Sequence, residues 1–119
     1  MLRLGWFSTG GGLGSLGLLT AVQDGILAGV LDARIEFVCS NREEGEAKGS
    51  DTFFRQVRDY GLPLITLSSR SFRRIYEGDR RAFKDNYHHE LISRLQDYKV
   101  DICVLAGYML IASEEICNR

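Results

Sequence analysis

Short apolar runs of strand length alternate with longer amphipathic stretches along this chain. The apolar runs cover residues 2–7, 34–40, 63–67 and 101–107. Between them, apolar residues recur at the three- and four-residue spacing of a buried helix face. In the first such stretch they are Leu16, Leu18, Leu19, Val22, Ile26 and Leu27. The pattern predicts strands and helices in alternation, which is typical of an α/β fold built on a parallel sheet.

The other amphipathic stretches and their boundaries refine this prediction. Residues 50–60 form a second helical pattern, whose apolar positions are Phe53, Phe54 and Val57. Residues 79–99 form another, whose apolar positions are Phe83, Tyr87, Leu91, Leu95 and Tyr98. Ser15 and Ser50 suit helix N-caps, and Pro63 suits the first residue of a strand. The fourth strand is apolar throughout, as strands buried on both faces are.

Parallel strands joined by right-handed crossovers predict a doubly wound sheet with the strand order 3-2-1-4. The expected fold class is therefore α/β, and 119 residues suffice for one domain or part of one. Ligands of such sheets bind beyond the carboxyl ends of the strands, where the winding reverses. This rule brings residues 10–15, 40–41 and 107–111 around one crevice.

A glycine cluster lies between the first strand and the first helix. It contains Gly10, Gly11, Gly12 and Gly14, and Ser15 follows directly. Without Cβ atoms, such a backbone turns sharply and approaches a ligand closely. The free N–H groups of the first helical turn then face the ligand, and the helix dipole favours an anion. The cluster predicts an anion site, with phosphate as the favoured ligand.

A dinucleotide is an alternative ligand for the same loop. Gly12, Gly14 and Gly17 match the G-x-G-x-x-G pattern of dinucleotide-binding folds. That pattern also requires an acidic residue for the ribose at the end of the second strand, and none occurs before Glu43. Arg42 could instead face a 2′-phosphate, so an NADP-binding module is an alternative function. A P-loop does not fit, because no lysine follows Gly14 and Ser15.

The basic stretch and the two histidines favour structural interpretations over a binding site. Residues 68–78 combine Arg70, Arg73 and Arg74 with aromatic side chains, a combination that can hold single-stranded nucleic acid. The stretch is short, so a solvated loop and helix is the preferred interpretation. His88 and His89 are adjacent, point about 100° apart on a helix, and so cannot form a bidentate metal site.

Composition narrows the class of protein. The chain is 45% hydrophobic and 26% charged with a net charge of −1, which indicates neither a nucleic-acid nor a membrane partner. No run approaches the length that spans a bilayer, and the start lacks a signal-peptide pattern. The three cysteines are widely spaced without metal-ligand spacing, which favours a reducing, cytoplasmic setting and no metal.

Four motifs resemble the phosphoribosylglycinamide formyltransferase family along essentially the whole chain. Residues 12–15, Gly-Leu-Gly-Ser, are similar to that family's Gly-Asn-Gly-Ser-Asn loop. Residues 37–42, Phe-Val-Cys-Ser-Asn-Arg, resemble its second strand, which ends in Ser-Asn-Lys or Ser-Asn-Arg. Residues 80–83 with 90–92 resemble one of its helices, and 101–109 resemble its strand ending in Leu-Ala-Gly-Phe/Tyr-Met.

The resemblance implies a Rossmann-like formyltransferase fold and formyl transfer from 10-formyltetrahydrofolate to the amine of a phosphorylated substrate, glycinamide ribonucleotide, in purine biosynthesis. It assigns the substrate phosphate to Gly12, Leu13, Gly14 and Ser15. It assigns the folate pocket to Arg80, Tyr108, Met109, Leu110 and Ile111. Two positions depart from the family, because Leu16 and Leu110 stand where the family has Asn and Arg.

The family's catalytic Asn-x-His-Pro motif and a later Asp have no counterpart in residues 1–119. The expectation is therefore an amino-terminal half, truncated before the catalytic motif, with no catalytic residue of its own and no activity alone. Its fourth strand would keep an open edge, which favours self-association. A formyltetrahydrofolate deformylase is the alternative within the same fold, because its fourth strand also ends in Tyr-Met.

Overall fold

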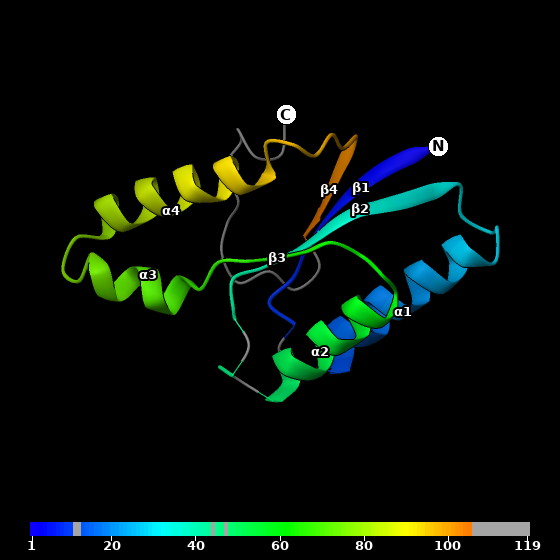
Figure 1. The fold of residues 1–119 in the computed structure, drawn as a ribbon, viewed down its shortest axis with the longest axis horizontal. Coiled ribbons are helices and arrows are strands. Elements are labelled where there is room, and N and C mark those ends of the chain that lie inside the picture. Colours follow the sequence, from blue (N-terminus) through cyan, green and yellow to red (C-terminus); the bar gives the residue numbers. More distant parts are fainter. Residues whose placement is uncertain (11–12, 44, 47, 106–119) are drawn as a thin grey trace.

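In the computed structural model, the described part of the chain comprises residues 1–10, 13–43, 45–46 and 48–105. Within it, β1 (Leu2–Phe7), β2 (Ala33–Ser40), β3 (Leu64–Thr66) and β4 (Ile102–Leu105) form one parallel sheet. The strand order is β3-β2-β1-β4, with the first strand in the interior (Figure 1). The doubly wound α/β fold and the order 3-2-1-4 are thus confirmed.

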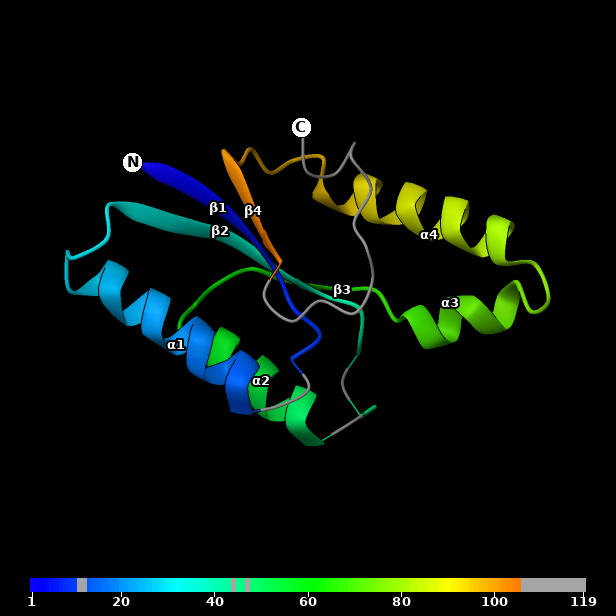
Figure 2. The same cartoon turned by 180° about the vertical axis from the view of Figure 1, so that it is seen from behind.

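The helices form two layers around this sheet. Helices α1 (Leu13–Leu27) and α2 (Lys48–Asp59) cover one face, and α4 (Arg80–Leu95) covers the other (Figure 2). The short helix α3 (Ser69–Ile75) follows β3 and lies beside α4, beyond the carboxyl end of the sheet. None of the helices in the described part is long and apolar enough to cross a membrane.

Two hydrophobic clusters fill the spaces between the layers. On the α1 and α2 side the buried residues are Leu4, Trp6, Leu19, Ile35, Val38, Phe53, Phe54 and Val57. On the α4 side they are Phe7, Phe37, Cys39, Leu67, Tyr87, Leu91 and Leu95. Side chains of a strand point alternately to its two faces, so β1 contributes to both clusters.

An irregularity in the pairing of β1 with β2 allows Ile35 and Phe37 to enter opposite clusters. Leu4 pairs with Ile35 but Gly5 pairs with Phe37, so the register shifts by one residue between them. The shift reverses the alternation along β2, as β-bulges do. A Cβ atom on Gly5 would lie 2.7 Å from Cζ of Phe37, so the glycine makes room for that ring.

Several boundaries differ from the expectations. Helix α1 begins at Leu13 and α2 at Lys48, so Ser15 and Ser50 lie within first turns and are not N-caps. The buried Ser50 hydroxyl instead accepts a hydrogen bond from the Arg42 guanidinium at 3.1 Å. Strand β3 starts after Pro63, at Leu64.

The end of α4 and the burial of α1 and β4 also differ from the expectations. Helix α4 ends at Leu95 and not near Lys99, although Asp79 caps its start by accepting from the Ala82 amide at 3.0 Å. Leu18 and Leu27 of α1 are exposed, because α1 is apolar on more than the face it buries. Strand β4 is half-exposed, because it lies at the edge of the sheet among the described residues.

Candidate functional site

Polar residues follow each of the first three strands at the carboxyl end of the sheet. Thr9 comes after β1, Asn41 after β2 and Ser68 after β3, and all three are buried. Ser8 and Ser40 beside them are also buried. Because the carboxyl ends of parallel strands meet at one edge, these side chains lie together. They form a polar platform beneath the expected crevice.

Hydrogen bonds join this platform across three segments of the chain. The Thr9 hydroxyl donates to Oδ1 of Asn41 at 2.8 Å, and Nδ2 of Asn41 donates to the Ser69 hydroxyl at 3.3 Å. The Ser69 amide donates to the Asn41 carbonyl oxygen at 3.0 Å. The Ser40 hydroxyl donates to the Thr9 carbonyl oxygen at 3.3 Å. The loop after β1 is therefore tied to the end of β2, and the end of β2 is tied to the start of α3.

Gly10 directly follows Thr9 of this platform, and α1 begins at Leu13. Gly10 has a φ of 72°, and a Cβ atom there would lie 2.8 Å from Cδ1 of Phe53, so both conformation and packing require glycine. Gly14 lies in the first turn of α1, where a Cβ atom would meet nothing within 4 Å. Of the predicted phosphate residues, Gly14 and Ser15 thus lie in this first turn. Gly12 and the Leu13 side chain lie outside the described residues.

A groove of about 1650 Å³ opens beside the platform, between it and helices α3 and α4. Thr9, Asn41 and Ser69 are among its lining residues. The basic side chains that line it, among the described residues, are Arg42, Arg70, Arg73, Arg74, Arg80, Arg81 and Lys84. Three acidic residues, Glu46, Glu77 and Asp79, line it as well. The excess of positive charge suits an anionic ligand.

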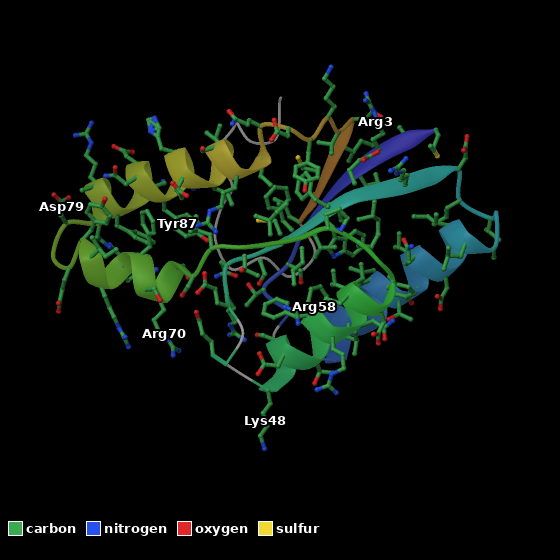
Figure 3. All side chains as sticks on the ribbon, in the orientation of Figure 1. Arg3, Lys48, Arg58, Arg70, Asp79 and Tyr87 are labelled. Carbon is green, nitrogen blue, oxygen red and sulfur yellow. The ribbon has the colours of Figure 1, made fainter. Side chains whose placement is uncertain are left out.

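Aromatic packing fixes α3 against α4 and thereby shapes the groove. Tyr87 is buried on α4, and its ring meets Phe72 edge-to-face at 5.5 Å between centroids and Phe83 at 5.7 Å. The Tyr87 hydroxyl donates to the Leu67 carbonyl oxygen at 2.5 Å. The Arg73 guanidinium lies 5.1 Å from the centroid of the Phe83 ring. Figure 3 shows Tyr87 on the side of α4 that faces α3, and Arg70 extending from α3 away from α4.

This arrangement gives the basic stretch a location that sequence reasoning missed. Residues 69–75 are helical and mostly exposed, as expected, but Ser69, Arg70, Arg73 and Arg74 also line the groove. Of the predicted folate residues, Arg80 lines this groove. Tyr108, Met109, Leu110 and Ile111 lie outside the described residues. The signal that could have identified Thr9 and Ser69 is the run of small polar residues directly after each apolar strand.

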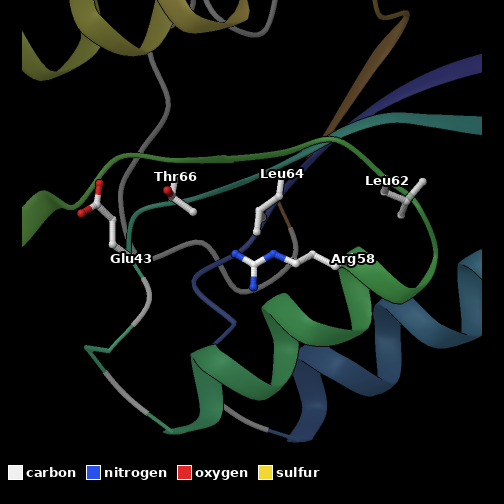
Figure 4. Close-up of a pocket in the computed structure, with 5 residues that line it drawn as sticks. All are labelled: Glu43, Arg58, Leu62, Leu64 and Thr66. Carbon is white, nitrogen blue, oxygen red and sulfur yellow. The ribbon is translucent and has the colours of Figure 1, made fainter.

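A smaller cavity of about 500 Å³ lies on the other side of β3, between this strand and α2. It is lined by Glu43, Arg58, Leu62, Leu64 and Thr66 (Figure 4). It contains none of the predicted site residues. No group of three or more His, Cys, Asp or Glu residues that could hold a metal occurs in the described part of the chain. His88 lines the larger groove, and His89 is exposed.

The parallel order 3-2-1-4, the glycine loop entering α1 and the polar crevice beyond the strand ends define an α/β protein of Rossmann-like architecture. More particularly, the chain has the fold of the amino-terminal half of phosphoribosylglycinamide formyltransferases.

Comparison with solved structures supports this assignment of the fold. Glycinamide ribonucleotide transformylase 1 from Symbiobacterium toebii matches 95% of this chain at 29% identity, with a TM-score of 0.64. The phosphoribosylglycinamide formyltransferase of Bacillus halodurans matches 94% at 22% identity (TM-score 0.65), and that of Coxiella burnetii, in complex with CHES, matches 96% at 20% identity (TM-score 0.59). This chain spans 44–48% of the length of those proteins. No protein-family model and no curated protein matches it.

Proposed function

We propose that this chain supplies the substrate-binding half of a folate-dependent formyltransferase. The reaction transfers a formyl group from 10-formyltetrahydrofolate to the amine of glycinamide ribonucleotide, a step of purine biosynthesis. The observation that carries the proposal is the position of the first turn of α1 and a basic groove at one carboxyl-end crevice. A phosphorylated amine and an anionic co-substrate need two such positively polarised regions side by side.

The phosphate of the ribonucleotide binds, in this proposal, at residues 12–15. The first turn of α1 contains no acidic residue that would repel an anion. Its free N–H groups and the helix dipole attract a phosphate. The open space beside Gly14 leaves room for phosphate oxygens to approach the backbone. The Ser15 hydroxyl is half-buried and adds a donor within the same turn.

The folate co-substrate occupies, in this proposal, the groove beside α3 and α4. Its tail carries carboxylates, which fit the excess of basic side chains there. Arg80 lies at the start of α4 and is exposed within that lining. Tyr108, Met109, Leu110 and Ile111 follow β4 in the sequence and complete the proposed pocket. Arg80 and residues 108–111 would thus hold different parts of one ligand.

The surroundings of Gly17 favour this function over an NADP-binding module. The third glycine of a dinucleotide fingerprint lets helix and strand pack closely. Here a Cβ atom on Gly17 would meet nothing within 4 Å, so no close packing requires that glycine. A deformylase would bind the same folate, and only the response to the ribonucleotide separates it from a transferase.

Isothermal titration of the 119-residue chain tests the proposal. We expect saturable binding of glycinamide ribonucleotide by the parent and no measurable binding by Gly14→Val, whose side chain fills the phosphate position. Gly17→Val is the matched control, because it places the same β-branched residue one turn later in equally open space. It should bind as the parent does. Saturable NADPH binding without any response to the ribonucleotide would overturn the proposal.

A further inference from the structure

The side chain of Asn41 connects two binding elements that are far apart in the sequence. Asn41 is 5% exposed and follows β2 directly. Its amide oxygen accepts from Thr9, which precedes the glycine loop, and its amide nitrogen donates to Ser69, the first residue of α3. We call these three residues the polar bridge. Both ends of one side chain are thus engaged by the two elements that flank the crevice.

We propose that Asn41 is a positioning residue, which acts through the polar bridge to hold the glycine loop at a fixed distance from the basic face of α3. This inference rests on the proposed function, since it concerns how the two halves of that site are held in register. The phosphate loop and the arginines of α3 must bind connected parts of one reacting pair. A shift of one relative to the other would weaken binding without removing any group that touches the ligand.

The polar bridge adds a side-chain link to the backbone bonds between the end of β2 and the start of α3, where the Ser69 hydroxyl also lies 3.4 Å from the Asn41 carbonyl oxygen. The backbone pairing of β2 with β3 ends at Ser40 and Thr66, so the ladder does not reach α3. Beyond the ladder, the Leu67 amide still donates to the Ser40 carbonyl oxygen and the Ser69 amide to that of Asn41. No strand pairing connects β1 directly to β3, because β2 lies between them. The amide of Asn41 spans this gap.

Burial strengthens the polar bridge. Thr9 is 3% exposed, and Ser8 and Ser40 next to it are fully buried. For the buried bond between Thr9 and Asn41, the loss of one partner leaves the other polar atom unsatisfied. The Thr9 hydroxyl donates at 2.8 Å, so its removal leaves Oδ1 of Asn41 without that donor. The loss reaches α3 through the same amide group.

Three variants of the 119-residue chain test this role. Thr9→Val keeps the shape of the side chain and removes the hydroxyl, whereas Thr9→Ser restores a hydroxyl at the same position. Thr52→Val is the matched control, since it removes an exposed hydroxyl that bonds to the Lys48 carbonyl within α2. All three changes are small enough for the fold to tolerate, which thermal unfolding verifies.

Two measurements separate the inference from the proposed function. Hydrogen exchange followed by mass spectrometry reports protection of α3, and titration with glycinamide ribonucleotide reports the site. For Thr9→Val we expect faster exchange in residues 69–75 and a dissociation constant raised about 3- to 10-fold, the range set by one lost hydrogen bond. Thr9→Ser and Thr52→Val should match the parent in both.

Unchanged exchange in α3 of the Thr9→Val variant would overturn the positioning role, whatever the ligand affinity. If instead α3 loses protection while the parent itself does not bind the ribonucleotide, the positioning role stands and the proposed function is wrong. If Thr9→Val speeds hydrogen exchange in α3 but binds the ribonucleotide as tightly as the parent does, the role of the polar bridge in binding is overturned.

Discussion

Gly10 combines two constraints at the point where the chain leaves β1. Its φ of 72° is unfavourable for any residue with a Cβ, and the Phe53 ring occupies the space that a Cβ would need. A left-handed conformation costs a non-glycine residue roughly 1–2 kcal/mol. Overpacking in a buried site adds about 1–3 kcal/mol. Each cost has a different origin, so a second glycine can separate them.

We predict that Gly10→Ala lowers the free energy of unfolding by about 2–5 kcal/mol, because conformational strain and overpacking both apply. Gly29→Ala is the control: Gly29 has a φ of 77°, but a Cβ there would meet nothing within 4 Å. It should cost only about 1–2 kcal/mol. Urea unfolding measures both variants. Equal losses would mean that the Phe53 contact does not constrain the loop.

Cys39 is a buried thiol on β2 whose ionisation is suppressed. Burial raises its pKa to about 12 from an ordinary value of 9.0, with a small opposing effect from the positive charge of Arg94. The folded state therefore holds this proton at pH values where the unfolded chain releases it. It follows that the stability contributed by Cys39 is complete below pH 9.0 and declines as the pH rises toward about 12.

We predict that iodoacetamide at mildly alkaline pH labels Cys39 only after unfolding, because the thiolate is the reactive form. Cys103 is half-buried and gives an internal comparison within the same sample. Mass spectrometry of the digested peptides measures both sites with and without urea. Labelling of Cys39 in the native chain as fast as of Cys103 would contradict its burial.

At the scale of elements, an ion pair joins the amino-terminal ends of β1 and β4. The Asp101 carboxylate accepts from the Arg3 backbone amide at 2.8 Å and from its guanidinium at 3.1 Å. The Asp101 amide in turn donates to the Arg3 carbonyl oxygen at 2.7 Å. The hydrogen bonds from the Arg3 side chain and amide hold the pKa of Asp101 below its ordinary value of 3.8. This lowered pKa favours the paired strands at neutral pH.

We predict that Asp101→Asn lowers the melting temperature at neutral pH but not in acid. The folded-state pKa of Asp101 is depressed, so its contribution is present above the unfolded value of 3.8 and is lost as the pH falls through the lower folded value. Thermal unfolding of the parent and the variant, at pH values from neutral to below 3.8, measures the difference in melting temperature. A difference in melting temperature that does not depend on pH would assign the effect to packing and not to charge.

The strands were predictable, since each is a short apolar run closed by polar or glycine residues. The helix starts were less so: Ser15 and Ser50 have N-cap chemistry, yet α1 and α2 begin two residues earlier. Sequence gives the capacity of a serine to cap but not the angle at which tertiary packing brings the helix in. For Ser50, the competing partner is Arg42, eight residues away.

The candidate site divides in the same way. The glycine loop and Asn41 were predictable from their places after strands. The groove was not, because it depends on how α3 packs against α4 through Phe72, Tyr87 and Phe83. Periodicity within one helix does not reveal the angle between two helices. The sequence therefore predicts a solvated surface for the charged residues of α3, whereas in the structure several of them line a groove.

At the scale of the whole molecule, the outer edge of β4 determines how the chain associates with other chains. In the described residues, β4 pairs with β1 alone, and Ile102 and Leu105 are 46% and 52% exposed. An exposed apolar edge strand is a template for pairing with another chain. We expect the 119-residue chain to self-associate through this edge.

We predict that Leu105→Lys shifts the purified chain toward monomer in sedimentation velocity experiments, because a charge on an edge strand opposes pairing between chains. Val30→Lys is the control: Val30 is 78% exposed in the turn between α1 and β2, away from the β4 edge. It should leave the sedimentation profile unchanged. A monomeric parent, or an equal effect of both lysines, would contradict association through β4.

The interior position of β1 has a consequence for how the chain folds during synthesis. Strand β1 is made first, and it pairs with β2 as soon as residue 40 is available. Its other edge must wait for β4, about 65 residues later. At roughly 5–20 residues per second, translation leaves that edge unpaired for about 3–13 s. The nascent chain therefore passes through a stage in which one edge of β1, an interior strand of the finished sheet, is unpaired and open to pairing with another chain.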